Sequence, residues 1–274
     1  MNEHAPDKQL TEDICMSGNT CSETCSEDLA PDVETASENY ARRFSGRIGR
    51  FFLDRQFEVI RPMLSNFSAC SILEVGGGHI QLTPYLLNAG FKVCVHGSTS
   101  KALGSAEKLK VSFANLDTVI SPITKLPFED KSFDVVICIR LLCHTSKWAD
   151  VIKELCRVSK NTVIVDYPPR SSFNCLYPLL FNLKAAAEGN TRTYLRFGEK
   201  EILDCFEKAN FRPSKKQREF FFPMVMHRVM KRRYVSVLLE KIADKCGLTQ
   251  LMGSPVMLSA TYCIAESLQT IEML

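Results

Sequence analysis

The sequence lacks the features of a membrane-spanning or secreted protein. Its first ten residues do not place a charged start before an apolar run, as a signal peptide does, and no apolar run approaches the roughly 18 residues of a spanning helix. Internal repeats are also missing. We therefore expect a cytoplasmic globular protein, and 274 residues suffice for one sizeable α/β domain with additions.

The chain also lacks a cysteine pattern typical of disulfides or metal sites, although it has 12 cysteines. Cys15, Cys21 and Cys25 lie near the N-terminus, but no second pair follows nearby to complete a zinc site, and the C-x3-C-x2-C pattern of radical enzymes is missing. We expect no bound metal. Free thiols inside apolar patterns behave as small hydrophobic side chains. Six cysteines fall in such patterns: Cys70, Cys94, Cys138, Cys156, Cys205 and Cys263.

Basic residues are nearly absent from the N-terminal segment. Residues 1–39 hold ten Asp or Glu and one Lys, so this segment carries −9 and the remainder +12. The segment is also rich in Ser and Thr and poor in large apolar residues. We expect a disordered acidic tail over residues 1–37 and one folded domain over 38–274. The tail could stay near basic surfaces of the domain or serve only solubility.

Apolar spacing predicts the order of helices and strands. Residues 38–63 show helical spacing with arginines interleaved, and strand and helix patterns then alternate, which predicts a parallel sheet covered by helices. The expected strands are 71–75, 91–96, 117–120, 133–139 and 162–167, and the expected helices are 82–89, 100–109 and 147–158. An insertion at 171–198 precedes a helix at 198–209, a strand near 218–226, a basic helix at 228–246 and a last strand near 255–264.

Three consecutive glycines, Gly76 to Gly78, follow the first expected strand. Bare backbone after a strand and before a helix is typical of a nucleotide-type site, although a tight turn without ligand has the same pattern. The dinucleotide pattern G-x-G-x-x-G is not complete, because Gln81 stands at its last position. Nicotinamide cofactors are therefore disfavoured.

Three segments in order resemble another family. They are ILEVGGG at 72–78, LPFEDKSFDVVICIRLLCH at 126–144 and VIKELCRVSKNTVIVDYP at 151–168. Over residues 40–170 the chain resembles the class I S-adenosylmethionine (SAM)-dependent methyltransferases of the small-molecule type. The resemblance implies an α/β, Rossmann-like sheet of seven strands in the order 3-2-1-4-5-7-6, mostly parallel with the last strand reversed. An N-terminal helix and the insertion would cover the site, and SAM would be the cofactor.

The resemblance assigns cofactor-binding residues but the chain departs from the family at three positions. Ile80 stands where the family has its third glycine, His96 or Gly97 stands where an acidic residue usually holds the ribose hydroxyls, and SPIT at 121–124 lacks the acidic residue near the adenine. Hydroxyls and amides could replace these groups. The expected cofactor-binding residues are Glu74, Gly76, Gly77, Gly78, Gly97, Ser98, Thr99, Thr124 and Arg140.

Methyl transfer from a sulfonium needs alignment of the acceptor, with a base where the acceptor is a hydroxyl or amine. We expect His144 and Tyr167 as catalytic candidates near the ends of the fourth and fifth strands, beside Asp166; a structural role for His144 is the alternative. The expected substrate-binding residues are Tyr40, Arg170, Asn190, Arg192 and Arg196. Their arginines favour an acceptor with a carboxylate, phosphate or phenolate.

These features predict SAM-dependent methyl transfer to a small or lipid-like acceptor that could be anionic. The alternative is a catalytically silent Rossmann-like binding or interaction protein. We expect no nucleic-acid partner. The basic segment after FFFPMVM, from His227 to Arg233, could form an amphipathic face for anionic lipid and so a peripheral membrane contact, or simply a solvated helix.

Overall fold

One seven-stranded sheet organises the computed structural model, which describes residues 30–172 and 194–263. The strand order is β3-β2-β1-β4-β5-β7-β6, as expected from the resemblance. The strands are β1 (Ser71–Val75), β2 (Lys92–Gly97), β3 (Leu116–Ile120), β4 (Phe133–Cys138), β5 (Ser159–Tyr167), β6 (Phe211–Phe220) and β7 (Ser254–Tyr262). Strands β1 to β5 pair in parallel, and β7 is antiparallel to both β5 and β6.

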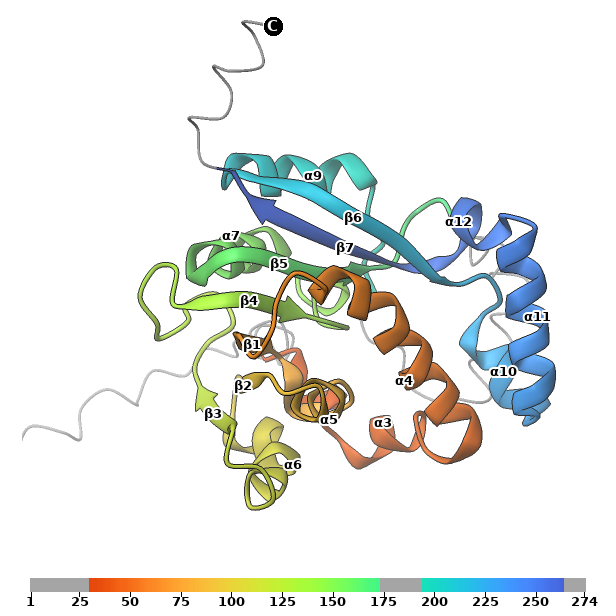
Figure 1. Ribbon diagram of the computed structural model, residues 1–274, viewed down its shortest axis with the longest axis horizontal. Coiled ribbons are helices and arrows are strands. Elements are labelled where there is room, and N and C mark those ends of the chain that lie inside the picture. Colours follow the sequence, from red (N-terminus) through yellow and green to blue (C-terminus); the bar gives the residue numbers. More distant parts are fainter. Residues whose placement is uncertain (1–29, 173–193, 264–274) are drawn as a thin grey trace, which may run out of the picture.

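Helices cover both faces of this sheet (Figure 1). The helices are α2 (Asp32–Thr35), α3 (Glu38–Arg42), α4 (Gly46–Ile60), α5 (Thr83–Asn88), α6 (Ser100–Lys110), α7 (Trp148–Val158), α9 (Glu199–Lys208), α10 (Met224–Met230), α11 (Arg233–Lys245) and α12 (Leu248–Met252). Three 3₁₀ turns add η1 (Arg61–Leu64), η2 (Gly77–His79) and η3 (Leu142–His144).

The alternation of side chains along β4 separates two cores. Val136 and Cys138 pack with α7 and α9 on one face, whereas Val135 and Ile137 pack with α4, α5 and α6 on the other. The parallel strands are therefore buried on both sides and read as apolar runs, which is why the sequence pattern located them. No disulfide joins any two of the eight described cysteines, and Cys138 and Cys156 are buried in the first core.

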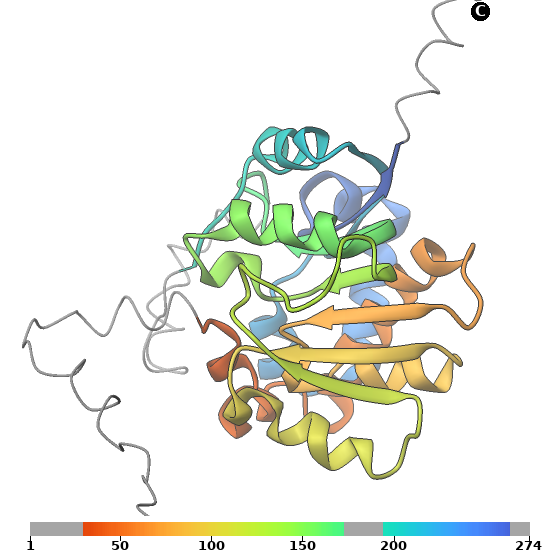
Figure 2. The ribbon, with the colours of Figure 1, turned by 90° about the vertical axis from the view of Figure 1, so that its left-hand side faces the viewer.

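The parallel strands end at one edge of the sheet. Because β7 is antiparallel to both neighbours, β6 runs in the same direction as β1 to β5, so its last residues lie at this edge too. Figure 2 shows β1 and β2 pointing toward the side where the N-terminal helices lie. Open α/β sheets bind ligands at this carboxyl edge, so the residues there form the candidate site.

The N-terminal helix differs from its prediction. A single helix was expected over 38–63, but the chain forms α3 and α4 with a break at Arg43–Ser45. Gly46 adopts a φ of +69° after this break, and a Cβ on Gly49 would stand 1.9 Å from the backbone carbon of Phe44. These two glycines therefore allow the tight turn that places α3 over the edge of the sheet.

The boundary of the acidic tail also differs from its prediction. Residues 30–37 were expected to be disordered, yet α2 contacts η2 and α6 and buries Asp32 and Thr35. The physical reason is local: the Asp32 carboxylate accepts hydrogen bonds from Ser98, which composition alone does not predict. Residues 1–29, with Cys15, Cys21 and Cys25, lie outside the described residues.

The observed strands and helices of the C-terminal region differ most from their predicted bounds. The strand expected near 218–226 is β6 at 211–220, because β6 is an edge strand whose residues 212–216 are exposed and polar. The apolar run that suggested a strand instead contains Pro223, which begins α10. The basic helix expected over 228–246 is divided into α10 and α11 by Lys231 in the left-handed conformation. Within the described residues, no helix is long and apolar enough to cross a membrane.

Candidate active site

The glycine loop after β1 packs closely against its own surroundings. Gly76 has a φ of +69°, which favours glycine, and the chain then forms the 3₁₀ turn η2. A Cβ on Gly78 would stand 2.0 Å from the Ala102 carbonyl oxygen of α6, and one on Gly77 would stand 2.5 Å from the Glu74 side chain. Packing therefore requires glycine at positions 77 and 78, whether or not a ligand binds.

Ile80, which stands where the family has a glycine, adopts a strained backbone conformation. Its φ is +48° and its ψ is 28°, in the left-handed region that β-branched residues rarely occupy. Such a conformation costs roughly 1–2 kcal/mol for a residue other than glycine. The half-buried side chain packs against the second core and offsets part of this cost.

Glu74 ends in a buried pocket beneath this loop. Its Oε2 accepts a hydrogen bond of 2.7 Å from the Thr83 hydroxyl, whereas Oε1 has no partner among the described residues. Burial raises the pKa of Glu74 to about 8, against the lowering effect of Thr83. The carboxyl group is therefore mostly protonated at neutral pH and can donate a hydrogen bond.

The end of β2 receives a carboxylate from the N-terminal segment. The Ser98 backbone N–H donates to Asp32 Oδ2 at 2.7 Å, and the Ser98 hydroxyl donates to Oδ1. Asp32 thus lies beside Gly97, at the strand end where the sequence lacks an acidic residue. Asp32 could not be assigned from the sequence pattern, because 66 residues separate it from Ser98. The Thr99 hydroxyl caps α6 by accepting from the Ala102 N–H at 3.2 Å.

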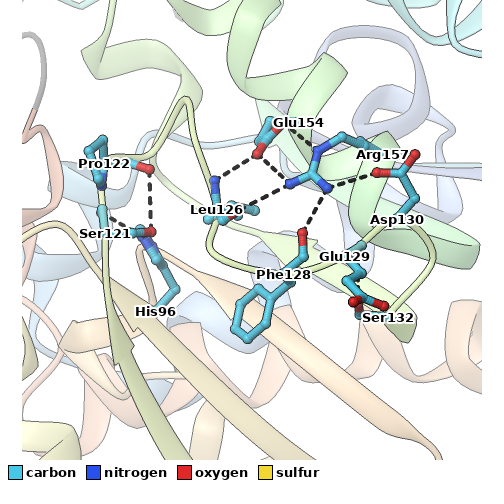
Figure 3. Close-up of polar contacts among 10 residues, drawn as sticks. All are labelled: His96, Ser121, Pro122, Leu126, Phe128, Glu129, Asp130, Ser132, Glu154 and Arg157. Carbon is cyan, nitrogen blue, oxygen red and sulfur yellow. Dashed lines mark hydrogen bonds and ion pairs between the residues drawn. The ribbon is translucent and has the colours of Figure 1, made fainter.

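A polar network holds the loop between β3 and β4, which contains Thr124 (Figure 3). Arg157 of α7 donates to the carbonyl oxygens of Leu126 and Phe128 at 3.0 and 2.7 Å and pairs with Glu154 and Asp130. Glu154 in turn accepts from the Leu126 N–H at 2.7 Å.

At the start of the same loop, His96 Nε2 lies 2.8 Å from the Ser121 carbonyl oxygen. Burial lowers the pKa of His96, so the imidazole is neutral and donates to this oxygen. The geometry of the loop is thus fixed from both ends, and Thr124 is half-buried between them.

Arg140 lies two residues after the end of β4 and occupies the centre of the carboxyl edge. Its φ is +61°, its backbone N–H donates to Asp166 Oδ1 at 2.6 Å, and its guanidinium donates to Gln81 Oε1. The Arg140 Cζ lies 4.0 Å from the centroid of the Phe44 ring, a cation–π distance. The Phe44 ring, in the break between α3 and α4, therefore covers the guanidinium.

Two buried carboxyl groups flank Arg140. Burial raises the pKa of Asp166 to about 6, against the lowering effects of the Arg140 N–H and charge. Burial likewise raises the pKa of Glu219, near the end of β6, to about 8, and neither of its carboxyl oxygens has a partner among the described residues. Burial also raises the pKa of Tyr40, whose phenol interacts electrostatically with Arg140 and Asp166. Glu219 was not predicted, because only the packing of α4 and α11 makes it buried.

The two expected catalytic residues lie in different surroundings. His144 is half-buried in η3, and its ring stands 5.8 Å from that of Tyr194 in an edge-on contact. Tyr167 is fully buried in the core beside α7 and α9, where its ring contacts that of Phe197, and its hydroxyl has no partner among the described residues. Asp166 and Tyr167 point to opposite faces of β5, so this geometry favours packing as the role of Tyr167 and places Asp166 beside Arg140.

The expected substrate-binding arginines lie farther out. Arg170 is exposed and pairs with Glu201 at 2.8 Å. Arg196 is also exposed, immediately before the short bridge between Pro169 and Phe197. Asn190 and Arg192 lie outside the described residues.

Comparison with known proteins agrees with this architecture. Residues 73–165 match the family model described as a methyltransferase domain. No curated protein sequence matches the chain. Among solved structures, magnesium protoporphyrin IX methyltransferase from Synechocystis PCC 6803 superposes with a TM-score of 0.60 at 14% identity over 88% of this chain and 100% of that one.

Two further structures show how widely this fold is used. A SAM-dependent methyltransferase from Thermotoga maritima, described as a possible histamine N-methyltransferase, has a TM-score of 0.57 at 17% identity over 84% of this chain and 98% of that one. The [4+2]-cyclase SpnF has a TM-score of 0.53 at 15% identity over 77% and 81%. At such identities the structural likeness establishes the fold. Residues 73–165 are thus similar to a methyltransferase domain, and the chain has the fold that these solved structures share.

Proposed function

We propose that this protein transfers the methyl group of SAM to a small or lipid-like acceptor whose reacting atom is a hydroxyl oxygen or an amine nitrogen. One observation carries the proposal. The glycine loop, the Asp32–Ser98 pair and the Arg140–Asp166–Glu219 group lie at the same carboxyl edge of the sheet, with the first two on the β1–β2 side and the last across β4, β5 and β6.

The residues at this edge fit SAM. Four buried polar atoms there have no partner among the described residues: Glu74 Oε1, His79 Nε2, Gln81 Nε2 and Arg140 Nη2. Buried polar atoms are nearly always satisfied by protein, water or ligand, and SAM carries a carboxylate, an amino group, hydroxyls and ring nitrogens that can pair with them. When bound, SAM supplies a methyl group already activated by its sulfonium.

Asp32 is the residue we assign to the ribose. A carboxylate offers about four lone-pair positions, and Ser98 uses two of them. The remaining two can accept the two ribose hydroxyls. This assignment supplies the acidic group that β2 lacks.

The acceptor side is richer in carboxyl groups than in cations. Asp166 and Glu219 flank the guanidinium of Arg140, while the exposed Arg170 is already paired with Glu201. Glu219, with its pKa raised to about 8, is mostly uncharged at neutral pH, so the charges of Arg140 and Asp166 balance. This balance disfavours the anionic acceptor that the arginines suggested, and it favours a neutral one. Asp166, with its pKa raised to about 6, is ionised near neutral pH and can take the proton that a hydroxyl or amine loses during transfer.

Two measurements test the proposal. Calorimetric titration of the wild-type protein with SAM, S-adenosylhomocysteine and NAD should give binding of the first two only. Release of S-adenosylhomocysteine should then be assayed with panels of hydroxyl and amine acceptors. Asp166→Asn should lower turnover about 10²-fold or more while SAM affinity is retained, because positioned bases contribute 10²–10⁴-fold.

The alternative is a binding protein without methyl-transfer activity, and the cyclase among the structural neighbours shows that the fold hosts other reactions. Asp150→Asn, an exposed carboxyl on α7, serves as the matched control. SAM binding without turnover on any acceptor, and with equal behaviour of both variants, would favour the binding protein. No SAM binding at millimolar concentration would remove the methyltransferase proposal.

A further inference from the structure

Helix α11 has its polar and apolar faces inverted. It buries Ser236, Glu240 and Ala243, while its exposed stripe consists of Tyr234, Leu238 and Ile242, which are 79%, 45% and 50% exposed. These three residues are spaced four apart and so lie along one side of the helix. A helix that merely covers the sheet would show the opposite arrangement.

The buried Glu240 of α11 joins this helix to neighbouring elements. Glu240 accepts hydrogen bonds from the N–H groups of Phe221 and Phe222, at 2.9 and 3.1 Å, and lies 2.8 Å from His227 Nε2. This bonding joins α11 to the turn after β6 and to α10. It explains the inward polar face but leaves the outward apolar stripe unexplained.

The apolar stripe continues onto the neighbouring helices. Val229 of α10 is 74% exposed, and Leu248 and Leu251 of α12 are also exposed. Among the residues that the structure describes, nine large hydrophobic side chains are exposed, and six of them lie between Val229 and Leu251. We name this set the α10–α12 face. In Figure 1, α10 and α11 stand together beyond the end of α4.

The same face is basic. Residues 224–252 contain six Lys or Arg but only two acidic residues, Glu240 and Asp244. Both acidic groups are engaged within the fold, Glu240 with His227 and Asp244 with Arg55 at 2.8 Å. The exposed cations Lys231 and Arg232 stand at the turn between α10 and α11, and Lys241 and Lys245 lie on α11 itself.

We propose that the α10–α12 face docks on an anionic membrane surface. Exposed aromatic and aliphatic side chains can enter the headgroup region while the surrounding cations contact anionic lipids, each contributing about 1 kcal/mol near the surface. A second copy of this chain is a poorer occupant, because its equivalent face would bring the same positive charge into contact. This proposal does not depend on methyl transfer.

The α10–α12 face is connected to the candidate active site through α4. Helix α11 is held to α4, which covers the candidate active site, by Arg55–Asp244 and by Arg233–Asp54 at 3.1 Å. A groove of about 410 Å³ lies between α4 and α11. Its lining combines Phe51, Phe57, Tyr85 and Val237 with the charged residues Asp54, Arg55, Glu58, Arg233 and Lys241. Docking would therefore place a groove of mixed polar and apolar lining beside the lipid, on the side of α4.

Sedimentation with vesicles tests the proposal on the full-length protein. Vesicles of phosphatidylcholine alone are compared with vesicles in which a quarter of the lipid is phosphatidylserine. We expect binding to the anionic vesicles only, and release as salt is raised. Leu238→Ser with Ile242→Ser should reduce binding at least ten-fold. The reversal Lys231→Glu with Arg232→Glu should reduce it further, because about 1 kcal/mol per cation is about five-fold and reversal also adds repulsion.

Matched controls lie on α6, at the opposite end of the sheet. Val111→Ser removes an apolar side chain that is 90% exposed, and Lys101→Glu with Lys108→Glu reverses two exposed cations. Both should leave binding unchanged, and thermal unfolding should confirm that every variant folds. Failure of the wild-type protein to bind either vesicle, or equal binding by the α11 and α6 variants, would overturn the proposal. So would a dimer in light scattering that the α11 substitutions dissociate, since it would show that a second copy occupies this face.

Discussion

Helices α7 and α11 are of similar length and lie in the same domain, yet their faces are opposite. Helix α7 buries Val151, Ile152 and Leu155 against the sheet. Helix α11 buries Ser236 and Glu240 and exposes Leu238 and Ile242. The difference shows that the first helix is stabilised by apolar burial, whereas the second is held by a buried carboxylate and has its apolar surface available for another partner.

The comparison predicts that a buried polar residue, Glu240, contributes more to the stability of the protein than the other residues of α11. Glu240→Ala leaves His227 and two buried backbone N–H groups without their acceptor, so we expect the free energy of unfolding to fall by ~3–5 kcal/mol. Asp244→Ala, which breaks the half-exposed pair with Arg55, should cost less than ~1 kcal/mol. Urea denaturation measures both. Equal effects would show that the inward face of α11 is not what holds it.

Apolar truncation should show the reverse order. Leu155 of α7 is fully buried, so Leu155→Ala should lower the free energy of unfolding by ~2–5 kcal/mol. Leu238→Ala in α11 should change it by less than ~0.5 kcal/mol, because the residue is already 45% exposed to water. A loss of more than ~1.5 kcal/mol at Leu238 would mean that another part of the chain covers this residue.

Two carboxyl groups on the sheet, those of Glu219 and Asp134, should make stability depend on pH in opposite ways. Glu219 on β6 has its pKa raised by burial from 4.5 to about 8, so between these values the folded chain keeps a proton that the unfolded chain releases. Stability from this group therefore falls as pH rises through that window, by ~1.4 kcal/mol per pH unit at most. Glu219→Gln should flatten this fall in unfolding measurements from pH 4.5 to 8.

Asp134 on β4 has the opposite behaviour and serves as the control. Hydrogen bonds from the Ser71 N–H and hydroxyl, at 3.0 and 2.7 Å, lower its pKa. Its contribution is present above its ordinary pKa and is lost as pH falls below it, so Asp134→Asn should lower stability by a constant amount from about pH 4.5 to 8 and change the slope of the profile only on the acidic side. A Glu219→Gln profile parallel to that of the wild type would contradict the burial of an unpaired carboxyl group.

Backbone strain at two left-handed residues, Lys131 and Ile80, gives the smallest effect. Lys131→Gly relieves a left-handed residue on an exposed loop and should raise the free energy of unfolding by ~1 kcal/mol. Ile80→Gly relieves the same strain but loses apolar packing, so its gain should be smaller, with SAM affinity equal or tighter. If Ile80→Gly instead destabilises the protein by more than ~1 kcal/mol, packing outweighs strain at this position.

The sequence predicted the parallel part of the fold well, because its strands are buried on both faces and appear as apolar runs between helical patterns. Strand β1 was located at its observed bounds, and β4 to within one residue. Strand β6 was misplaced, because an edge strand tolerates exposed charges such as Arg212 and Lys216.

The candidate site was predictable only where residues adjoin a motif. Gly76 directly follows β1 and Arg140 lies two residues after β4, so both could be assigned from the sequence. Asp32 and Glu219 could not, because their roles depend on contacts with Ser98 and with the cover formed by α4 and α11, which no local pattern encodes. The exposed α10–α12 face was visible as a basic amphipathic segment, but which side of α11 faces outward required the hydrogen bonds of Glu240.

Titration of Asp32→Asn with S-adenosylhomocysteine tests most directly the claim that the carboxyl edge is a SAM site completed by the N-terminal segment. The substitution keeps the size of the side chain and an acceptor for the Ser98 N–H, but removes the charge and two lone-pair positions. We predict one site per chain in the wild type and an affinity at least ten-fold lower in Asp32→Asn, with Asp150→Asn equal to the wild type. Equal affinity in all three proteins, or tighter binding by Asp32→Asn, would contradict the account.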